Sequence, residues 1–271
     1  MAAPSVFLVG SGAAATALAM ALSRAGVSVL GIHGRSARKV REAASRARVE
    51  ASAGRFPAAL GLADVVWIAV SDDAIRSVAT SLARSGILGR RQIVLHASGV
   101  WGREVLVPLA PAVRATGSLH PLQSLAEPAL AAASLRGATF AVEGDAIARR
   151  AGAAIARALG GRPVTIPTRS KALYHAAASM TSNGTVGVVA AAVDALVASG
   201  LPRSRALRIL VPLLEGTVGN LTTLGLPSAL TGPVARGDRK TIAAHRAALS
   251  HVSGLLPLYD ALVRAQRRIS T

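Results

Sequence analysis

The sequence predicts an α/β protein in which a doubly wound, mostly parallel β-sheet is followed by an all-helical C-terminal domain. Short apolar runs alternate with Ala-rich stretches from Ser5 to Ile166, and such runs cease after Pro167. Hydrophobic residues make up 51% of the chain and aromatic residues only 3%, which favours packed helices over a β-sandwich. Alternating strand and helix patterns are typical of a parallel sheet covered on both faces. At 271 residues, we expect two domains, residues 1–167 and 168–271.

The first domain is expected to contain seven short strands separated by helices. Gly26 and the pair Gly160-Gly161 stand where helices must stop, and Asp145 stands where a helix can begin. The expected strands are Ser5–Val9, Val27–Ile32, Val65–Val70, Gln92–Leu95, Ala115–Leu119, Ala138–Val142 and Pro163–Ile166.

A long helix opens the second domain. Residues 170–199 contain no proline, which predicts one helix of about 30 residues and about 45 Å. Its second half is apolar on nearly every side, and such a helix must be buried. We therefore expect it to pack against helices of its own domain and of a second subunit, in a homodimer. The further expected helices are Arg203–Leu224, with a kink or break at Pro212, Asp238–His251 and Leu255–Arg268.

A glycine turn joins the first strand to the first helix. The segment VFLVGSGAAATALAMALSRAG places Gly10, Gly12 and Ala15 in a G-x-G-x-x-A pattern. Such glycines permit a tight turn and let the pyrophosphate of a dinucleotide approach the start of the helix, as in a Rossmann-type fold. A purely structural turn is the alternative. The residues expected to bind the cofactor here are Gly10, Ser11, Gly12, Ala13 and Ala14.

The end of the second strand indicates which dinucleotide binds. NAD-binding members of this fold carry an acidic residue there, which bonds the ribose hydroxyls. This chain has Arg35 and Ser36 instead, and a guanidinium can bind a 2′-phosphate through two hydrogen bonds. The sequence therefore predicts NADP(H). Ser36 could instead simply cap the following helix.

Composition and charge limit the other classes of function. The absence of cysteine excludes disulfides and thiolate metal sites, and we expect no metal. The segment MAAPSVFLVG lacks an export signal, which predicts a cytoplasmic protein. No uncharged apolar stretch reaches the length of a membrane span. The net charge of +18 could attract nucleic acid, but the basic residues are scattered without interleaved aromatic residues. We expect no membrane or nucleic-acid partner.

Polar residues lie at the ends of three predicted strands. Val70 ends one strand and is followed by Ser71, Ser98 follows another, and His120 follows a third. Ligands of doubly wound folds bind beyond the carboxyl ends of the strands. We therefore expect Val70 and Ser71 to contact the cofactor and Ser98 and His120 to take part in catalysis. A histidine at a strand end could equally be structural.

The start of the long helix carries a polar stripe. Lys171, His175, Ser179 and Ser182 fall at helical spacing on one face, with Asn183 next to them. The chain has only three lysines among 31 basic residues, so a solvated face would be expected to use arginine. A solvent-exposed face remains the alternative. We expect Lys171 and His175 to be catalytic and Ser179 and Asn183 to bind substrate.

Lys171 is the first candidate for proton donor. Burial near a nicotinamide lowers the pKa of a lysine, which can then protonate a carbonyl oxygen as hydride arrives at carbon. Arginine cannot take this role because it is effectively never deprotonated. In the Gly- and Pro-rich loop LTGPVARGD, Thr231 and Arg236 are candidates to bind the carboxylate of a small anionic substrate.

The motifs together resemble a bacterial family. The stretches VGSGAAATALA, GSLHPLQSL, KALYHAAASMTSN and LTGPVARGD, followed by His245, are similar to proteins that join a Rossmann-like domain to a helical domain of unknown function. The wider group contains ketopantoate reductase, pyrroline-5-carboxylate reductase and the β-hydroxyacid dehydrogenases. The resemblance implies a dimer that reduces a small oxo acid or imine with NADPH, ketopantoate being favoured. In those enzymes the catalytic lysine is followed one turn later by asparagine, where this chain has His175.

Three hypotheses follow. The first is an NADPH-dependent reductase of a 2-oxo acid, with Lys171 as proton donor. The second is an imine or opine-type reductase, in which the substrate already carries its proton. The third is a non-catalytic NADP-binding regulator, or a nucleic-acid binder that uses the +18 charge. The sequence does not separate the first two, because both need the same hydride donor and the same pocket.

Overall fold

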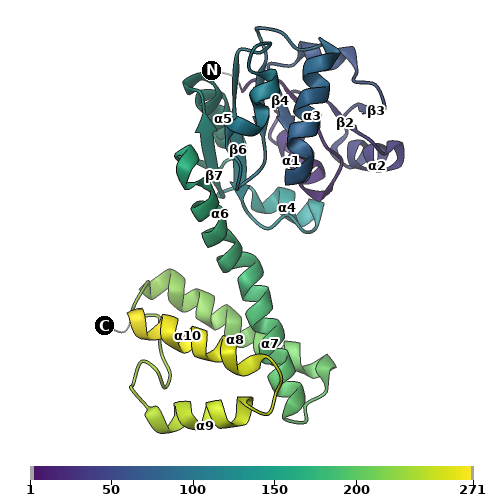
Figure 1. Ribbon diagram of the computed structural model, residues 1–271. Coiled ribbons are helices and arrows are strands. Elements are labelled where there is room, and N and C mark those ends of the chain that lie inside the picture. The colour runs from purple at the N-terminus through teal and green to yellow at the C-terminus, as the bar shows by residue number, and fades with distance from the viewer. Residues whose placement is uncertain (1–2, 270–271) are drawn as a thin grey trace. The chain divides into compact units, whose positions relative to one another are not determined.

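The computed structural model describes residues 3–269. It contains two compact units, the first ending at Ser179 and the second beginning at Met180 (Figure 1). The helix at the start of the expected second domain therefore belongs to the first unit.

The first unit is built on an eight-stranded sheet with the order β3-β2-β1-β4-β5-β6-β7-β8. Neighbouring strands are parallel except for β6 and β7, which are antiparallel. The predicted mostly parallel, doubly wound sheet followed by helices is confirmed. The strands are β1 Val6–Val9, β2 Val29–Gly34, β3 Ala51–Ala53, β4 Val65–Ile68, β5 Ile93–His96, β6 Ala115–Leu122, β7 Thr139–Gly144 and β8 Arg162–Thr165.

Helices cover both faces of this sheet. Along β1, Val6 and Leu8 belong to one apolar cluster and Phe7 and Val9 to another, so alternate residues are buried on opposite faces. Strands of parallel sheets are buried on both sides in this way. The helices of this part are α1 Ala13–Arg24, α2 Ala37–Ala47, α3 Asp72–Ser85, α4 Pro128–Ser134 and α5 Ala146–Ala158, with short 3₁₀ helices η1 Ala58–Leu62, η2 Arg103–Leu109 and η3 Thr168–Ser170.

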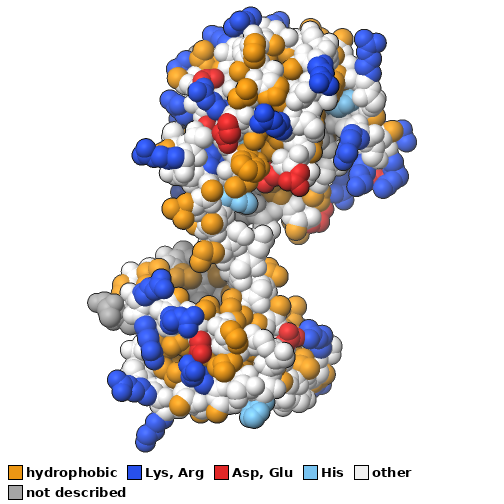
Figure 2. Space-filling view, viewed as in Figure 1, with side chains coloured by type: hydrophobic (Ala, Val, Ile, Leu, Met, Phe, Trp, Pro, Cys, Tyr) orange, Lys and Arg blue, Asp and Glu red, His pale blue; other side chains and the backbone are white. Residues whose placement is uncertain are grey.

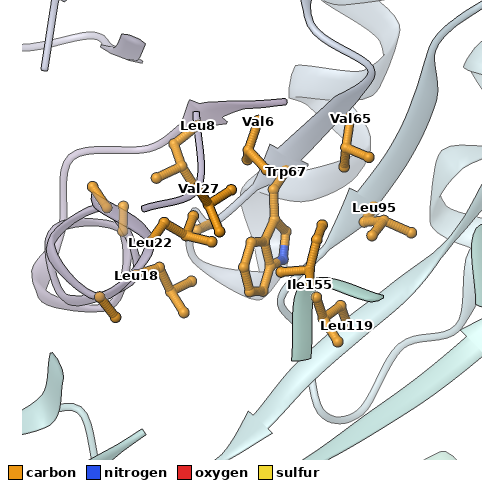
Figure 3. Packing of buried hydrophobic residues seen from close by; sticks show 14 of the residues in the cluster. Val6, Leu8, Leu18, Leu22, Val27, Val65, Trp67, Leu95, Leu119 and Ile155 are labelled. Carbon is orange, nitrogen blue, oxygen red and sulfur yellow. The ribbon is translucent and has the colours of Figure 1, made fainter. Parts of the chain in front are cut away.

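Trp67 of β4 lies at the centre of the larger apolar cluster. Its side chain is fully buried, with Leu18 of α1, Leu119 of β6 and Ile155 of α5 around it (Figure 3). Strands and helices on one face of the sheet therefore meet at this indole.

The expected single helix over residues 170–199 is interrupted by a π turn. Helix α6 spans Lys171–Ser179, the π turn spans Met180–Gly184, and α7 spans Thr185–Ala198. A π turn adds a residue to the helical repeat. The polar stripe was predicted from regular α-helical spacing, and the π turn breaks that spacing. The stripe therefore does not continue from Lys171 and His175 to Ser182 and Asn183.

The second unit contains helices α7, α8, α9 and α10. Helix α8 spans Arg203–Leu224 and continues through Pro212, so the expected break does not occur. Helix α9 spans Arg239–Leu249, and Asp238 caps it by accepting from the amide of Thr241 at 3.0 Å. Helix α10 spans Leu255–Ile269.

Helices α7 and α8 leave much apolar surface exposed. Val193 is the only buried residue of α7, whereas Val186 and Leu213 are each 69% exposed. Figure 2 shows apolar side chains exposed on the visible face of this unit. Within residues 3–269, one helical stretch, Thr168–Ala198, is long and apolar enough to cross a membrane. A single stretch of this kind is weak evidence for a membrane-spanning helix. We expected α7 to be buried on every side. Within the single chain described here, most of its residues are not buried.

Replacing Trp67 by alanine should lower the free energy of unfolding of the first unit by about 3–5 kcal/mol, because the lost indole leaves a cavity at the centre of the core. Trp101→Ala is the matched control, since Trp101 is 44% exposed. Urea unfolding followed by circular dichroism measures both. Equal losses for the two variants would contradict the packing described above.

Candidate active site

The turn between β1 and α1 is shaped for close approach of a ligand. Gly10 has φ +141°, and a Cβ there would overlap the carbonyl oxygen of Ala69, so only glycine fits. A Cβ at Gly12 meets no atom within 4 Å, so the backbone there is open. No side chain caps α1, which leaves the first amides of the helix free to bind an anion. These features fit the pyrophosphate of a dinucleotide.

The end of β2 lies beside this turn. A Cβ at Gly34 would come 2.7 Å from the hydroxyl oxygen of Ser11, so the two segments pack closely. Arg35 is exposed and has no polar partner within residues 3–269. Ser36 caps α2, its hydroxyl accepting from the amide of Lys39 at 3.4 Å. Arg35 is therefore available to an added phosphate, while the hydroxyl oxygen of Ser36 already has a structural role.

At the end of β4, Val70 is half-buried and Ser71 is exposed. Ser71 is the N-cap residue of α3, and its side chain makes no capping bond. Both residues lie beyond the carboxyl end of a strand that pairs with β1, where ligands of this fold class bind.

His96 ends β5 and is fully buried. Its Nδ1 accepts from the amide of Ser98 at 3.2 Å, so the ring hydrogen is on Nε2, which donates to the carbonyl oxygen of Gly102 at 2.9 Å. Burial, together with the nearby Lys171 charge, lowers the pKa of His96 to about 3. This histidine is a neutral structural group that shapes the loop after β5.

That loop brings Ser98 and Gly99 into the site. The hydroxyl oxygen of Ser98 accepts from the amides of Val100 and Trp101 at 3.2 and 3.1 Å. A Cβ at Gly99 would overlap the His175 ring and come 2.8 Å from Nε2 of His120. The loop backbone therefore contacts both imidazoles directly, and the Ser98 hydroxyl holds the loop in shape.

His120, Tyr174 and His175 form an aromatic cluster. Nδ1 of His120 lies 3.1 Å from the Tyr174 hydroxyl, and the His120 ring meets both Tyr174 and His175 edge-on with centroids 5.7 Å apart. Burial lowers the pKa of His120 to about 3, and burial raises the pKa of Tyr174 to about 12. Both groups are neutral at neutral pH, so the hydroxyl can donate to Nδ1 and leave a hydrogen on Nε2 beside Gly99.

Lys171 opens α6 and is 1% exposed. Its Nζ donates to the carbonyl oxygen of Ser98 at 2.9 Å and to the hydroxyl oxygen of Ser118 at 2.7 Å. Burial lowers the pKa of Lys171 to about 8, although Glu143, Glu104 and Asp72 act in the opposite direction. The lysine is thus a buried acid that can lose its proton near neutral pH.

Two buried residues that sequence reasoning missed complete the site. The antiparallel register of β6 and β7 places Ser118 opposite Glu143, and the Ser118 hydroxyl donates to Glu143 Oε2 at 3.3 Å. Glu143 is 2% exposed, and its Oε1 accepts from the Thr168 hydroxyl at 2.7 Å. The sequence did offer a signal for Glu143, which is the one charged residue in the apolar strand TFAVEG. A charge is rarely buried without a partner, so such a residue indicates a buried polar contact.

The structure brings four predicted catalytic residues into one region, Lys171, His175, Ser98 and His120. Ser179 ends α6. The other predicted substrate-binding residues, Asn183, Thr231 and Arg236, belong to the second unit. Within residues 3–269, no cluster of three His, Asp or Glu side chains could hold a metal ion.

Comparison with known proteins identifies the domains. A Rossmann-like domain model matches residues 2–121, and the model of a domain of unknown function, DUF2520, matches residues 138–266. The chain therefore carries a Rossmann-like domain followed by a DUF2520 domain. A search of curated proteins finds no match.

Solved structures share this two-domain organisation over their whole length. A Bacteroides fragilis protein, provisionally described as an NADP oxidoreductase, is 23% identical with a TM-score of 0.78 and 98% coverage of both chains. Protein TM1727 from Thermotoga maritima is 26% identical, with a TM-score of 0.74 and the same coverage. A reductive aminase from Aspergillus terreus, in complex with NADPH and ethyl-5-oxohexanoate, is 16% identical with a TM-score of 0.65, covering 98% of this chain and 94% of that one. The similarity establishes the fold of the Rossmann-like and DUF2520 domains.

His96 and His120 should remain neutral between about pH 5 and 8, because burial disfavours their charged forms. Nitrogen-detected NMR of the imidazoles should show no titration of either ring and a hydrogen on Nε2 of His96. Spectra of His96→Gln and His120→Gln assign the signals. A ring that becomes cationic in this range would contradict the burial described above.

Proposed function

We propose that the protein is an NADPH-dependent reductase of a small 2-oxo acid, with ketopantoate the first substrate to test. The observation that carries the proposal is the buried Lys171 ammonium group, held by the Ser98 carbonyl oxygen just after β5 and by the Ser118 hydroxyl within β6. Two of its three N–H bonds are used, and the third has no partner within residues 3–269. In the proposed reaction, Lys171 would donate that hydrogen to the substrate oxygen.

The cofactor-binding residues follow from the geometry of the first unit. The turn from Gly10 to Ala14 and the free amides of α1 are suited to the pyrophosphate. Arg35, without a polar partner in the described chain, is suited to the 2′-phosphate. The similarity to a reductive aminase crystallised with NADPH supports the same choice. When bound, NADPH supplies the hydride for the reaction.

Lys171 would protonate the substrate oxygen. As the carbonyl carbon is reduced, negative charge develops on its oxygen, and an ammonium group within hydrogen-bond distance can neutralise it by giving up a proton. A pKa of about 8 suits this role, because the group is charged at neutral pH yet releases its proton readily. His120, with a hydrogen on Nε2, would donate a second hydrogen bond to the substrate.

Imine reduction is the alternative. The similarity to a reductive aminase favours it. An iminium substrate already carries its proton, so Lys171 would then orient the substrate or exclude water without acting as an acid. Activity on cyclic imines that survives Lys171→Ala would support this alternative.

We further propose that the protein acts as a cytoplasmic homodimer. Exposed apolar side chains gather on α7 and α8, among them Val186, Leu207 and Leu213, and contiguous apolar surface of this kind marks sites of association. The only apolar cluster found in the described second unit comprises Val234, Ile242 and Val263, with Tyr259 against it. A second copy of the chain would bury this surface. Ser179, Asn183, Thr231 and Arg236 stay predictions as substrate-binding residues.

The test of the proposed activity is NADPH oxidation with a panel of 2-oxo acids, including ketopantoate, and of cyclic imines. Wild-type protein should reduce an oxo acid, and the rate should fall as pH rises through about 8, because Lys171 then loses the proton it must donate. Lys171→Ala should reduce the rate by about a hundredfold or more, whereas Lys240→Ala, which removes an exposed lysine, should not. Binding of NADPH with no turnover of any compound would contradict the proposal.

Arg35→Ala should weaken NADPH binding by about tenfold or more, the effect expected from losing a hydrogen bond to a charged phosphate. NADH binding should change little, because NADH has no 2′-phosphate. Arg38→Ala is the control, since Arg38 is paired with Glu42. Calorimetric titration of both cofactors measures these effects, and equal weakening of NADH and NADPH would refute the assignment of Arg35.

A charged residue in the exposed apolar surface of α8 should disrupt the dimer. Leu213→Arg places a guanidinium where Leu213 is 69% exposed, and Leu130→Arg in α4 is a control at a similarly exposed leucine of the first unit. Light scattering after size-exclusion chromatography should give dimers for wild type and Leu130→Arg and monomers for Leu213→Arg. A wild-type monomer would exclude the dimer.

A further inference from the structure

A continuous chain of hydrogen bonds leads from exposed Thr168 to buried Lys171. The Thr168 hydroxyl donates to Glu143 Oε1 at 2.7 Å, the Ser118 hydroxyl donates to Glu143 Oε2 at 3.3 Å, and Lys171 Nζ donates to Ser118 Oγ at 2.7 Å. Glu143, Ser118 and Lys171 are each at most 2% exposed, whereas Thr168 lies at the surface. Every group between the ends can both accept and release a proton.

The β5–η2 loop packs directly on this chain. A Cβ at Gly102 would come 2.6 Å from Glu104 Oε2 and Thr168 Cγ2 and 3.2 Å from Glu143 Cδ, so a larger residue there would displace these side chains. The Gly102 amide donates to Glu104 Oε1 at 2.8 Å, and its carbonyl oxygen accepts from His96. The backbone therefore covers Glu143 from this side, and only the Thr168 end of the chain is exposed.

The burial of Lys171 creates a need for such a route. A lysine that gives a proton to a substrate must regain one before the next turnover, and an amine that is 1% exposed has little direct access to water. The charged and titratable groups around it are Glu143, Glu104, Asp72, His96 and His120. Of these, the structure connects Glu143 to the Lys171 amine by hydrogen bonds through one hydroxyl.

We propose that Thr168, Glu143 and Ser118 form a relay that returns a proton from solvent to Lys171 after each turnover. The inference rests on the proposed role of Lys171 as proton donor. The Glu143 carboxylate first takes the hydroxyl proton of Thr168 on Oε1, and Thr168 takes one from hydronium. The carboxyl group so formed gives its proton from Oε2 to Ser118 as Ser118 gives its own hydroxyl proton to the neutral Lys171 amine. Rotation of the carboxyl group carries its proton from Oε1 to Oε2. The net change is hydronium and amine to water and ammonium, with no change in oxidation state.

The relay predicts a kinetic signature in two variants. Thr168→Val removes the exposed hydroxyl, and Glu143→Gln keeps a side chain of the same shape that cannot carry the proton. At about pH 7 the first turnover of NADPH oxidation by Thr168→Val should keep its rate, because Lys171 starts charged, and later turnovers should slow by about tenfold or more. Glu143→Gln also removes the charge that raises the pKa of Lys171, so its first turnover is the reference for its own later turnovers, which should be slower by a similar factor. Thr165→Val, at an exposed threonine of β8, is the matched control. Equal slowing of first and later turnovers would indicate positioning only and would overturn the relay.

A second measurement needs no cofactor or substrate. If the relay exists, the ammonium hydrogens of Lys171 should exchange with water faster than the burial of the amine alone would allow. Thr168→Val and Glu143→Gln should each slow this exchange rate, which NMR measures at Nζ. Circular dichroism confirms that the variants fold. Unchanged exchange in both variants would overturn the proposal. If wild-type protein reduces no substrate yet exchange slows as expected, the proposed activity fails, while the proton path between solvent and Lys171 stands.

Discussion

The buried ammonium group of Lys171 is the constraint on which the organisation of this site depends. Removing an unpaired charge from water is costly, and the cost falls only where acceptors and opposite charge are provided. The chain provides the Ser98 carbonyl oxygen, the Ser118 hydroxyl and, beyond it, the Glu143 carboxylate. Because these groups come from the β5 loop, β6 and β7, one side chain fixes α6 against three parts of the first unit.

The polar groups around Lys171 are arranged to suit its ammonium charge. His96 and Glu143 are the register partners of Ser118 on the two adjacent strands, so the three residues form a row across the sheet. On one side the buried imidazole is neutral and holds the loop through Gly102, and on the other the carboxylate offsets the ammonium charge. Glycine at position 99 allows the loop to contact His120 and His175. Ser118 thus stands between a neutral imidazole on one strand and a carboxylate on the other.

The sequence predicted the regular elements better than the network between them. The glycine turn at Gly10 and Gly12 and the seven apolar strands follow local rules, whereas β3, with the residues Ala51–Ala53, has no apolar run to reveal it. Lys171 could be singled out because the chain has only three lysines. Glu143 could not be paired with Ser118 in advance, because their contact depends on β6 and β7 being the one antiparallel pair of the described sheet.

The central claim is that Lys171 is an ammonium group held in a buried, hydrogen-bonded site with its pKa lowered by burial. Carbon-13 NMR of the lysine Cε groups tests it directly, because only three lysines contribute signals and a Lys171→Arg variant assigns one of them. Lys171 should give a resonance that titrates with a midpoint near 8. A Lys171 signal that stays in its charged form up to the ordinary lysine pKa of about 10.4 would contradict it.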